Sequence, residues 1–304
     1  MSKIKICVDA GHGYDTPGKR TPAMPKDIDY NKDGVMDIKK GISFREHVAN
    51  VGVAMFLTKE LARCGFEIYK SGFDDENPRD DMDISLTKRQ LGIKRAGCDY
   101  SVSIHFNAYG DGTDFNSAQG IGVYIHNNYP KDSKKFAEVV MKYLIQGTKQ
   151  KNRGITSAAL AMCNCLKMKT KAAILVECAF MTNLNEALNM VSNNDYWEET
   201  AVEIAKGICD YCGVTYVEEI QEDPKPEEVY KVLAGAFGYK LNADFLVEKL
   251  NEMGFRDAYM YTTFAGGKPL YRVQVGAYKV RSNAEKLLIR TKAAGFYNAY
   301  IQNY

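Results

Sequence analysis

Short, continuously apolar segments alternate with amphipathic segments over the first two thirds of the chain. Five apolar segments have the length and composition of buried strands: residues 4–10, 66–71, 99–106, 122–126 and 172–177. Between them, apolar residues recur with helical spacing near residues 43–64, 84–97, 131–150 and 195–212. Strands that are apolar on both faces and separated by helices predict an α/β fold with a mostly parallel twisted sheet flanked by helices.

An acidic segment, VEEIQEDPKPEE, interrupts this pattern at residues 217–228. Six acidic residues, two prolines and one lysine cannot build a hydrophobic core, so the segment is predicted to be a solvated and rather stiff linker. We therefore expect a large domain at 1–215, a linker at 216–229 and a small domain at 230–304.

The last part of the chain contains an internal repeat with an offset of 41 residues. YKVLAGAF at 230–237 matches YRVQVGAY at 271–278, and residues 242–259 match residues 283–300. Each half has the pattern of a strand, a helix and a second strand. One half alone cannot bury its apolar face, so the two halves are predicted to share one sheet with helices on one side, as a small α+β domain.

Composition and charge bear on the class of protein. The 304 residues are 45% hydrophobic, and the formal net charge of +2 gives no indication of nucleic-acid binding. The longest apolar run, residues 172–181, is much shorter than the roughly 18–20 residues that a transmembrane helix needs. The eight cysteines lack the paired spacing of a zinc ribbon, which favours reduced and mostly buried thiols.

The first ten residues, MSKIKICVDA, contain no apolar signal region and lead directly into a strand pattern. We therefore expect a protein that is synthesised in the cytoplasm without a signal peptide.

Polar side chains with metal-binding or acid–base chemistry follow three of the predicted strands. His12, His105 and Glu177 all lie at carboxyl ends of strands, where α/β sheets gather their ligands. A catalytic zinc ion needs three protein ligands and an open position, and two histidines with one glutamate are a known set. Glu46, at the start of the long helix, is the candidate for the glutamate.

Glu46 also has an ordinary structural explanation. Ser43 and Glu46 have the spacing of a capping box, in which Glu46 would bond the backbone amide of residue 43. His47 points about 100° around the helix from Glu46, since one turn takes 3.6 residues. His126 ends another strand and could line the cleft, but it is expected at the surface. Glu177 ends the most apolar strand, where a partly buried carboxylate would suit a general base.

Four blocks of the sequence, VDAGHG, REHVAN, SVSIHFNA and VECAFMTN, resemble the zinc-dependent N-acetylmuramoyl-L-alanine amidases of the amidase-3 family in order and spacing. The resemblance covers roughly residues 3–212. It implies that His12, Glu46 and His105 hold one zinc ion and that Glu177 is catalytic. It also implies cleavage of the amide between N-acetylmuramic acid and L-alanine of the peptidoglycan stem peptide. Asn107 and Arg153 are further candidates for substrate binding.

An insertion at about 19–42 departs from the family pattern. Within it, the segment DYNKDGVMDIKK at 29–40 has oxygen-bearing residues at the offsets of a calcium loop. The candidate calcium ligands are Asp29, Asn31, Asp33 and Asp37. The twelfth position is Lys40 instead of the bidentate glutamate of an EF-hand, so the alternative is a turn-rich loop. No autoinhibitory helix of the kind that some cell-division amidases carry is evident.

The repeat resembles a SPOR domain over its whole length. This implies a βαββαβ unit that binds peptidoglycan, especially glycan strands stripped of stem peptides. From residue 228 onward the chain has 11 Lys and Arg against 6 Asp and Glu, which suits acidic wall material. Tyr230, Gln274 and Tyr278 are candidate glycan-binding residues; the alternative is that these tyrosines pack beneath the helices.

Three functions remain to be compared. A zinc amidase delivered to the wall by a SPOR domain explains both domains, and the complete set of four site residues favours it. A non-catalytic wall-binding or regulatory protein and a zinc peptidase of related fold are the alternatives. An amidase without a signal peptide would act after membrane permeabilisation or mother-cell lysis, as a phage endolysin or a sporulation autolysin.

Overall fold

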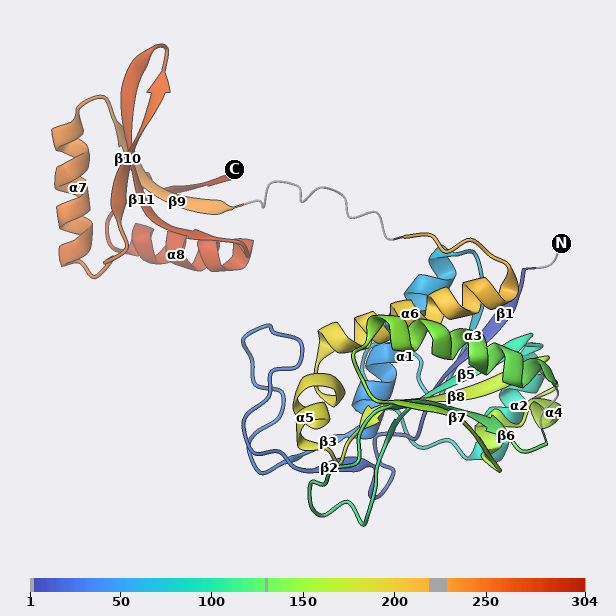
Figure 1. Cartoon of the computed structure of the whole chain (residues 1–304). Helices are drawn as coiled ribbons and strands as arrows, with labels where there is room; N and C mark the ends of the chain where they lie inside the picture. Colours follow the sequence, from blue (N-terminus) through green and yellow to red (C-terminus); the bar gives the residue numbers. More distant parts are fainter. Residues whose placement is uncertain (1–2, 129–130, 219–228, 304) are drawn as a thin grey trace. The chain divides into compact units, whose positions relative to one another are not determined.

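The computed structural model describes residues 3–128, 131–218 and 229–303 (Figure 1). The chain divides into two compact units, Met1–Glu218 and Glu219–Tyr304. Most of the segment expected to be a linker, residues 219–228, lies outside the described residues.

A six-stranded sheet forms the centre of the first unit, in the order β4-β1-β5-β8-β6-β7. The strands are β1 (Lys5–Ala10), β4 (Glu67–Ser71), β5 (Tyr100–Asn107), β6 (Ile121–His126), β7 (Asn152–Ala158) and β8 (Ala172–Phe180). Strands β4, β1, β5 and β8 are parallel, whereas β6 is antiparallel to β8 and parallel to β7. The predicted mostly parallel sheet is confirmed. Strand β7 was not predicted, because this edge strand is polar and largely exposed.

Helices cover both faces of this sheet (Figure 1). They are α1 (Glu46–Arg63), α2 (Leu86–Ala96), α3 (Lys131–Gly147), α4 (Cys165–Met168), α5 (Leu184–Glu186) and α6 (Asn194–Cys212), with short helical turns at Ala161–Cys163 and Ala187–Val191. Helices α1, α3 and α6 bury their apolar faces in the main core on one side. Helix α2, the 161–163 turn and α4 enclose a smaller core on the other. The four long helices match the predicted segments, with ends displaced by up to three residues.

A small pair of strands at the two ends of the insertion was not predicted from the apolar pattern. Strands β2 (Arg20–Ala23) and β3 (Ser43–Arg45) pair antiparallel, so the expected helix at 43–64 begins only at Glu46. The ring of Tyr30 lies 5.1 Å from that of Trp197 in α6, between ring centroids. This aromatic contact fastens the insertion to the main core.

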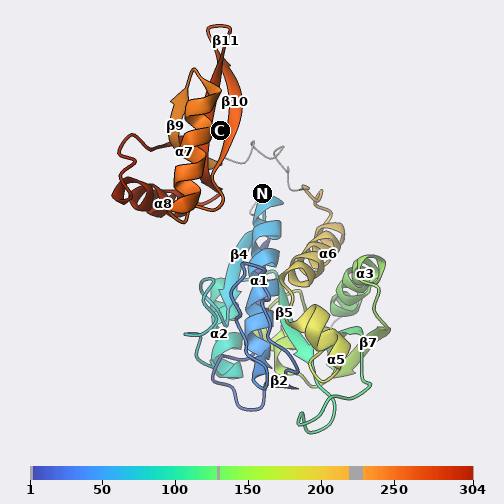
Figure 2. The same ribbon diagram turned by 90° about the vertical axis from the view of Figure 1, so that its left-hand side faces the viewer.

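The second unit is a four-stranded antiparallel sheet in the order β10-β11-β9-β12 (Figure 2). Its elements are β9 (Tyr230–Phe237), α7 (Lys240–Glu252), β10 (Tyr259–Ala265), β11 (Lys268–Tyr278), α8 (Arg281–Ala293) and β12 (Tyr300–Asn303). The predicted βαββαβ order is confirmed. Leu250 of α7 and Ala284 of α8 share one apolar cluster with Val232 and Val273 of the sheet, so both helices pack on the same face.

Two further features concern the whole chain. In the part that the structure describes, no helix combines the length and the apolar character needed to cross a membrane. All eight cysteines lie within the described residues; they form no disulfide there, and seven of them are buried.

Candidate metal centre and catalytic cleft

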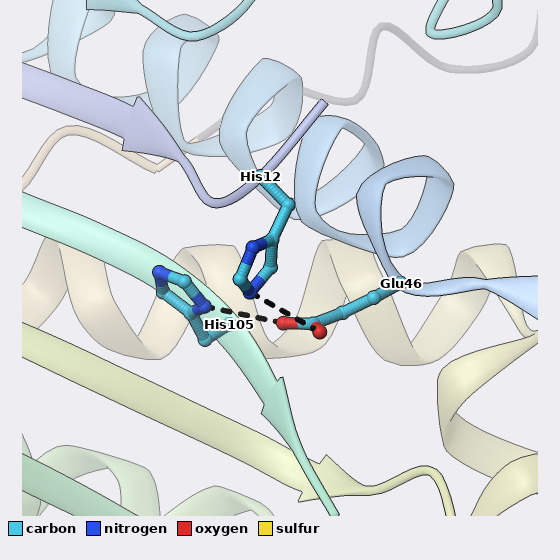
Figure 3. A group of neighbouring side chains, drawn as sticks. All are labelled: His12, Glu46 and His105. Atoms are coloured by element: carbon cyan, nitrogen blue, oxygen red, sulfur yellow. Dashed lines mark hydrogen bonds and ion pairs between the residues drawn. The ribbon is translucent and has the colours of Figure 1, made fainter. Parts of the chain in front are cut away.

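Three side chains from separate elements meet at one point of the first unit (Figure 3). His12 lies in the turn after β1, Glu46 is the first residue of α1, and His105 lies near the end of β5. Nδ1 of His105 is 3.1 Å from Oε1 of Glu46, and Nε2 of His12 is 3.4 Å from Oε2. One ligand atom of each lies within 4.8 Å of the others, a spacing that no other His, Cys, Asp or Glu group reaches among the described residues.

Glu46 does not act as a helix cap. Arg45 occupies the N-cap position without a side-chain cap bond, and Ser43 belongs to the preceding strand. Oε1 of Glu46 instead accepts a hydrogen bond from the backbone amide of Phe106 at 3.2 Å. The capping-box alternative is therefore wrong, because the carboxylate is turned toward the sheet and the two histidines.

The chemistry of this cluster fits a zinc ion. Oε2 of Glu46 is buried and has no hydrogen-bond donor among the described residues. Burial lowers the pKa of His12 to about 4, so its imidazole is neutral at pH 7 and presents a lone pair. Burial opposes the charge on His105, but the hydrogen bond and charge of Glu46 raise its pKa overall. Two imidazoles and one carboxylate around an unsatisfied oxygen are a ligand set that catalytic zinc sites use.

Arg89 holds the turn that carries His12, and sequence reasoning missed it. His12 has a φ of +62°, which is uncommon for a residue with a side chain. The buried Arg89 side chain of α2 donates from Nη2 to the carbonyl oxygen of His12 and from Nη1 to that of Ala10, the latter at 2.6 Å. Arg89 thereby ties the backbone on both sides of Gly11 to one guanidinium group.

Asp9 completes this support from within β1. Its Oδ1 lies 3.0 Å from Nη1 of Arg89 and accepts from Ser71 Oγ at 2.7 Å, while Oδ2 accepts from Ser103 Oγ at 2.5 Å. The carboxylate is fully buried. The one sequence signal for this network is an aspartate at the end of an otherwise apolar strand, since a charge there needs a buried partner.

Gly11 and His47 define the wall behind the cluster. A Cβ atom on Gly11 would lie 2.2 Å from Cε1 of His105, so only glycine leaves room for that ring. The carbonyl oxygen of Gly11 lies 2.9 Å from both Nδ1 of His47 and Nδ2 of Asn50. Nε2 of His47 is 3.0 Å from Oδ2 of Asp81. His47 thus links the turn after β1 to the 74–83 loop, and both of its ring nitrogens are used in these contacts.

His126 was expected at the surface, and this expectation is wrong. It is buried at the end of β6, where Nδ1 accepts from the amide of Asn128 at 3.0 Å. Nε2 lies 3.4 Å from Nδ2 of Asn164, so this face of the ring is covered by the segment before α4. The apolar pattern of β6 did not reveal this covering segment.

Glu177 lies beside the cluster of His12, Glu46 and His105, on β8 next to the strand that carries His105. It pairs in register with His105 across β5 and β8, and its Oε2 is buried without a hydrogen-bond partner among the described residues. Burial raises the pKa of Glu177 to about 8. Glu177 shares a pocket of about 310 Å³ with both predicted substrate residues, Asn107 and Arg153. The other lining residues, which the sequence did not suggest, are Gly122, Tyr124, Lys151 and Thr156.

The residues predicted to bind calcium are Asp29, Asn31, Asp33 and Asp37. Each of the four accepts a hydrogen bond within the loop: for example, Oδ2 of Asp29 accepts from the amide of Gly34 at 2.8 Å, and Oδ2 of Asp37 accepts from the amide of Tyr30 at 3.1 Å. These contacts are the ones expected of a turn-rich loop. Calcium binding at this loop stays a prediction.

The predicted glycan-binding residues of the second unit are less exposed than expected. Tyr230 and Tyr278 face each other across β9 and β11 and pack, half-buried, against the apolar cluster. Gln274 is only 4% exposed and lies at a β-bulge between the two strands. The packing alternative therefore describes the environment of both tyrosines, and the role of all three residues in glycan binding stays a prediction.

Arg272 of β11 carries a polar network that the sequence did not single out. Its Nη1 donates to the hydroxyl of Tyr300 at 3.0 Å and to Oε1 of Gln302 at 2.7 Å, both on β12. Its Nε donates to Oγ1 of Thr263 on β10 at 3.2 Å. The network thus spans the sheet from one edge strand to the other.

Comparison with known proteins agrees with this geometry. Residues 6–210 match the family model of N-acetylmuramoyl-L-alanine amidases, and residues 226–303 match that of the SPOR domain. A sporulation-specific N-acetylmuramoyl-L-alanine amidase of Bacillus subtilis (strain 168) is 24% identical over 254 residues, 83% of this chain and 82% of the relative. The N-acetylmuramoyl-L-alanine amidase CwlM of Bacillus licheniformis is 28% identical over 260 residues, 85% of each chain.

The fold of the first unit also has solved counterparts. The crystal structure of an N-acetylmuramoyl-L-alanine amidase from Clostridium difficile 630 matches with a TM-score of 0.54 and 25% identity, over 70% of this chain and 98% of that one. The catalytic domain of the amidase CwlV from Bacillus (Paenibacillus) polymyxa matches with a TM-score of 0.52. The family match spans two thirds of the sequence and contains all four residues of the cluster and cleft. The chain therefore belongs to the N-acetylmuramoyl-L-alanine amidase family and carries a SPOR domain behind the amidase domain.

Proposed function

We propose that this amidase cleaves peptidoglycan with a zinc ion held by His12, Glu46 and His105 and with Glu177 as its general base. The bond that breaks is the amide between the lactyl group of N-acetylmuramic acid and L-alanine. The observation that carries the proposal is the cluster itself: three metal-binding side chains converge beside a buried, unpaired carboxylate.

When bound, zinc would polarise the substrate carbonyl and lower the pKa of a water molecule to about 7. The residues of the chain do the remaining work. Arg89 and Gly11 hold the His12 turn against His105, so two of the three ligands are positioned before the metal arrives. Glu177 takes a proton from the attacking water and returns it to the departing alanine nitrogen.

The environment of Glu177 suits a group that must accept a proton and return it. Burial at the end of β8 raises its pKa to about 8, and a carboxyl pKa raised toward neutral pH suits a group that both accepts and donates a proton. A cation at the neighbouring cluster favours the ionised form, since an opposite charge within a few ångströms lowers a carboxyl pKa. Burial and the cation thus act in opposite directions on the pKa of Glu177. A pKa near neutral lets the carboxylate accept a proton from water and then donate it to the leaving nitrogen.

We also propose that the SPOR domain delivers the enzyme to glycan strands. The Arg272 network and the excess of cationic residues in this unit support contact with sugars and acidic wall material. Binding of the full chain and of an Arg272→Ala variant to glycan strands freed of stem peptides tests this. Equal binding by both proteins would show that Arg272 does not contribute to glycan binding.

The decisive experiment on the reaction is digestion of purified peptidoglycan by the wild type, the metal-free protein and the Glu177→Gln variant. Mass spectrometry should find new L-alanine amino termini and intact glycan strands with the wild type alone. Cuts elsewhere in the stem peptide would identify a zinc peptidase instead. Binding without cleavage under any metal would identify a non-catalytic wall protein.

For the cellular role, we propose action during mother-cell lysis at the end of sporulation in preference to phage release. The support is the Bacillus subtilis relative, which is named as sporulation-specific and matches over 83% of this chain. Deletion of the gene should delay mother-cell lysis in a sporulating culture, and lysis on the normal schedule would argue against this role.

A further inference from the structure

We infer that Lys151 and Arg153 form a subsite for a carboxylate of the stem peptide, on the side of the reacting amide where the peptide leaves. The inference rests on the proposed function, because it uses the role of Glu177 as proton donor to the departing nitrogen. It goes further by naming the chemical group that this side of the cleft recognises and the residues that recognise it.

The two sides of the cleft have different linings. His12 and His105 line a pocket of about 220 Å³ together with Leu86 and Met162. Glu177 lines the other pocket, of about 310 Å³, which none of the three metal-binding residues reaches. The reacting amide must lie between these pockets, since it has to contact both the metal cluster and Glu177.

The direction of the substrate follows from the proton transfers. A general acid must come within hydrogen-bond distance of the atom that it protonates, about 2.6–3.2 Å. The atom protonated by Glu177 is the alanine nitrogen, so the peptide attached to it extends into the pocket on the Glu177 side. A pocket of about 310 Å³ is at the small end of ligand sites and would hold the first residues of the stem, not the whole peptide.

The charge of this pocket indicates what it holds. Apart from Glu177, its charged lining residues are the cations Lys151 and Arg153. The charge of Arg153 acts on the carboxyl of Glu186 and lowers its pKa, but Glu186 does not line the pocket. Two cations beside the path of a peptide attract an anionic group of that peptide. The residue after L-alanine is the nearest part of the stem peptide that could carry such a group, as a carboxylate that is not part of a peptide bond.

The Arg153 side chain and the Lys151 backbone are each held by contacts within the unit. The Arg153 guanidinium stacks 4.8 Å from the ring centroid of Phe180, and its Nη1 donates to the carbonyl oxygen of Gln119 at 3.2 Å. The carbonyl oxygen of Lys151 accepts from the amide of Ile121 at 3.0 Å. A guanidinium held in this way presents its remaining donors as a fork, which matches the two oxygens of a carboxylate.

The test compares two muramyl dipeptides that differ at one group. In the first, the residue after L-alanine is glutamate with a free α-carboxylate; in the second, that carboxylate is replaced by a carboxamide of nearly the same shape. The wild type should show a KM about tenfold lower for the carboxylate, as expected for one charge-assisted contact. Its kcat should be similar for both dipeptides, because the contact is made equally in the ground and transition states.

Single variants assign the effect to the two residues. Lys151→Ala and Arg153→Gln should each reduce the preference for the carboxylate to about two- to threefold through a higher KM for that dipeptide. Lys149→Ala is the matched control, since this exposed lysine lies two residues away and does not line the pocket. Equal KM values in the wild type, or an undiminished preference in both variants, would overturn the subsite.

A binding measurement separates this inference from the proposed reaction. Calorimetric titration of each dipeptide into the Glu177→Gln protein reports the carboxylate preference without turnover. A preference that persists in an inactive variant supports the subsite and the role of Glu177 together. Full activity of Glu177→Gln would refute the proposed base, and absence of any carboxylate preference in binding would refute the subsite.

Discussion

His105 and Glu177 occupy the same register position on the adjacent parallel strands β5 and β8. Neighbouring residues at one register position of a parallel sheet have side chains on the same face. The residue that would bind the metal and the residue that would handle the proton are therefore fixed side by side by the hydrogen bonds of the sheet. No loop has to close to bring them together.

The first prediction concerns Glu177. Glu177→Gln should lower kcat for amide cleavage by about 10²–10⁴-fold, because the amide cannot accept the proton of the attacking water. Zinc should still bind with unchanged stoichiometry, since Glu177 is not among the three converging ligands. Steady-state kinetics on a muramyl peptide and metal analysis of the purified variant measure both quantities.

A matched control for this change is available in the same unit. Glu203→Gln alters another buried glutamate whose carboxyl pKa burial raises to about 8, but it lies in α6 away from the cleft. Glu203→Gln should keep near-normal activity. Equal losses in both variants would mean that removing a buried carboxylate, and not a catalytic base, explains the effect of Glu177→Gln.

The second prediction concerns the metal. Chelation should abolish cleavage, and stoichiometric zinc should restore it. His105→Ala should weaken zinc binding by at least about tenfold, since one of three protein ligands is lost. Competition with a chromophoric chelator gives the affinity. An unchanged zinc affinity in this variant would place the metal elsewhere in the chain.

The third prediction concerns the buried pair of Arg89 and Asp9. Arg89→Met should destabilise the first unit by about 3–5 kcal/mol, because it leaves the fully buried Asp9 carboxylate without its cation. Denaturant unfolding followed by fluorescence of Trp197 measures this unit alone, since the chain has no other tryptophan. A loss below about 1 kcal/mol would contradict the assigned role of the pair.

A double variant keeps this test informative. Asp9→Asn together with Arg89→Met removes both charges, so it should recover part of the stability that Arg89→Met alone loses. Zinc affinity should be lower than in the wild type in both Arg89→Met and the double variant, because the carbonyl oxygen of His12 lacks its guanidinium donor in each. Wild-type zinc affinity in the double variant would show that Arg89 supports the fold without positioning His12.

The fourth prediction is a pH dependence that originates at Glu203. Both carboxylate oxygens are buried without a hydrogen-bond partner among the described residues, and burial raises the pKa from 4.5 to about 8. The folded chain therefore keeps a proton that the unfolded chain loses, so this residue lowers stability progressively as the pH rises from about 4.5 to about 8. Below about pH 4.5 both states are protonated, and the effect disappears.

Glu203→Gln removes this titration and should flatten the dependence of stability on pH. At pH 8 the variant should be more stable by about 1–2 kcal/mol, or roughly 2–8 °C in Tm, and near pH 5 the difference should be small. Thermal unfolding of the full chain, followed by Trp197 fluorescence across this range, gives the comparison. Parallel stability curves for the two proteins would show that Glu203 does not carry the effect.

Local patterns were sufficient to predict the layers of the fold and the four residues of the cluster and cleft. Continuous apolar runs predict buried strands, and polar residues at the ends of those runs are candidate site residues. His12, His105 and Glu177 were predicted in this way. The internal repeat likewise predicted the order of elements in the second unit, because half of that unit could not bury its apolar face alone.

Partners that are distant in sequence were not predictable from those patterns. Strand β7 is an exposed edge strand, so no apolar run marks it. Lys151 reaches the Glu177 pocket only because β7 pairs with β6. Gln274 is likewise buried between Val273 and Val275 of β11, although a polar residue at this position gives no local signal of burial.

The sequence by itself therefore determined the buried strands and the long helices, and which of their ends carry chemistry, since both depend on near neighbours along the chain. Only the tertiary structure determined which distant residues each of these side chains contacts. Arg89 supports the His12 turn across 77 positions of sequence, and Glu46 contacts the strand of His105 across 59. Hydrogen bonds and burial at that separation depend on how the layers pack, which no local period encodes.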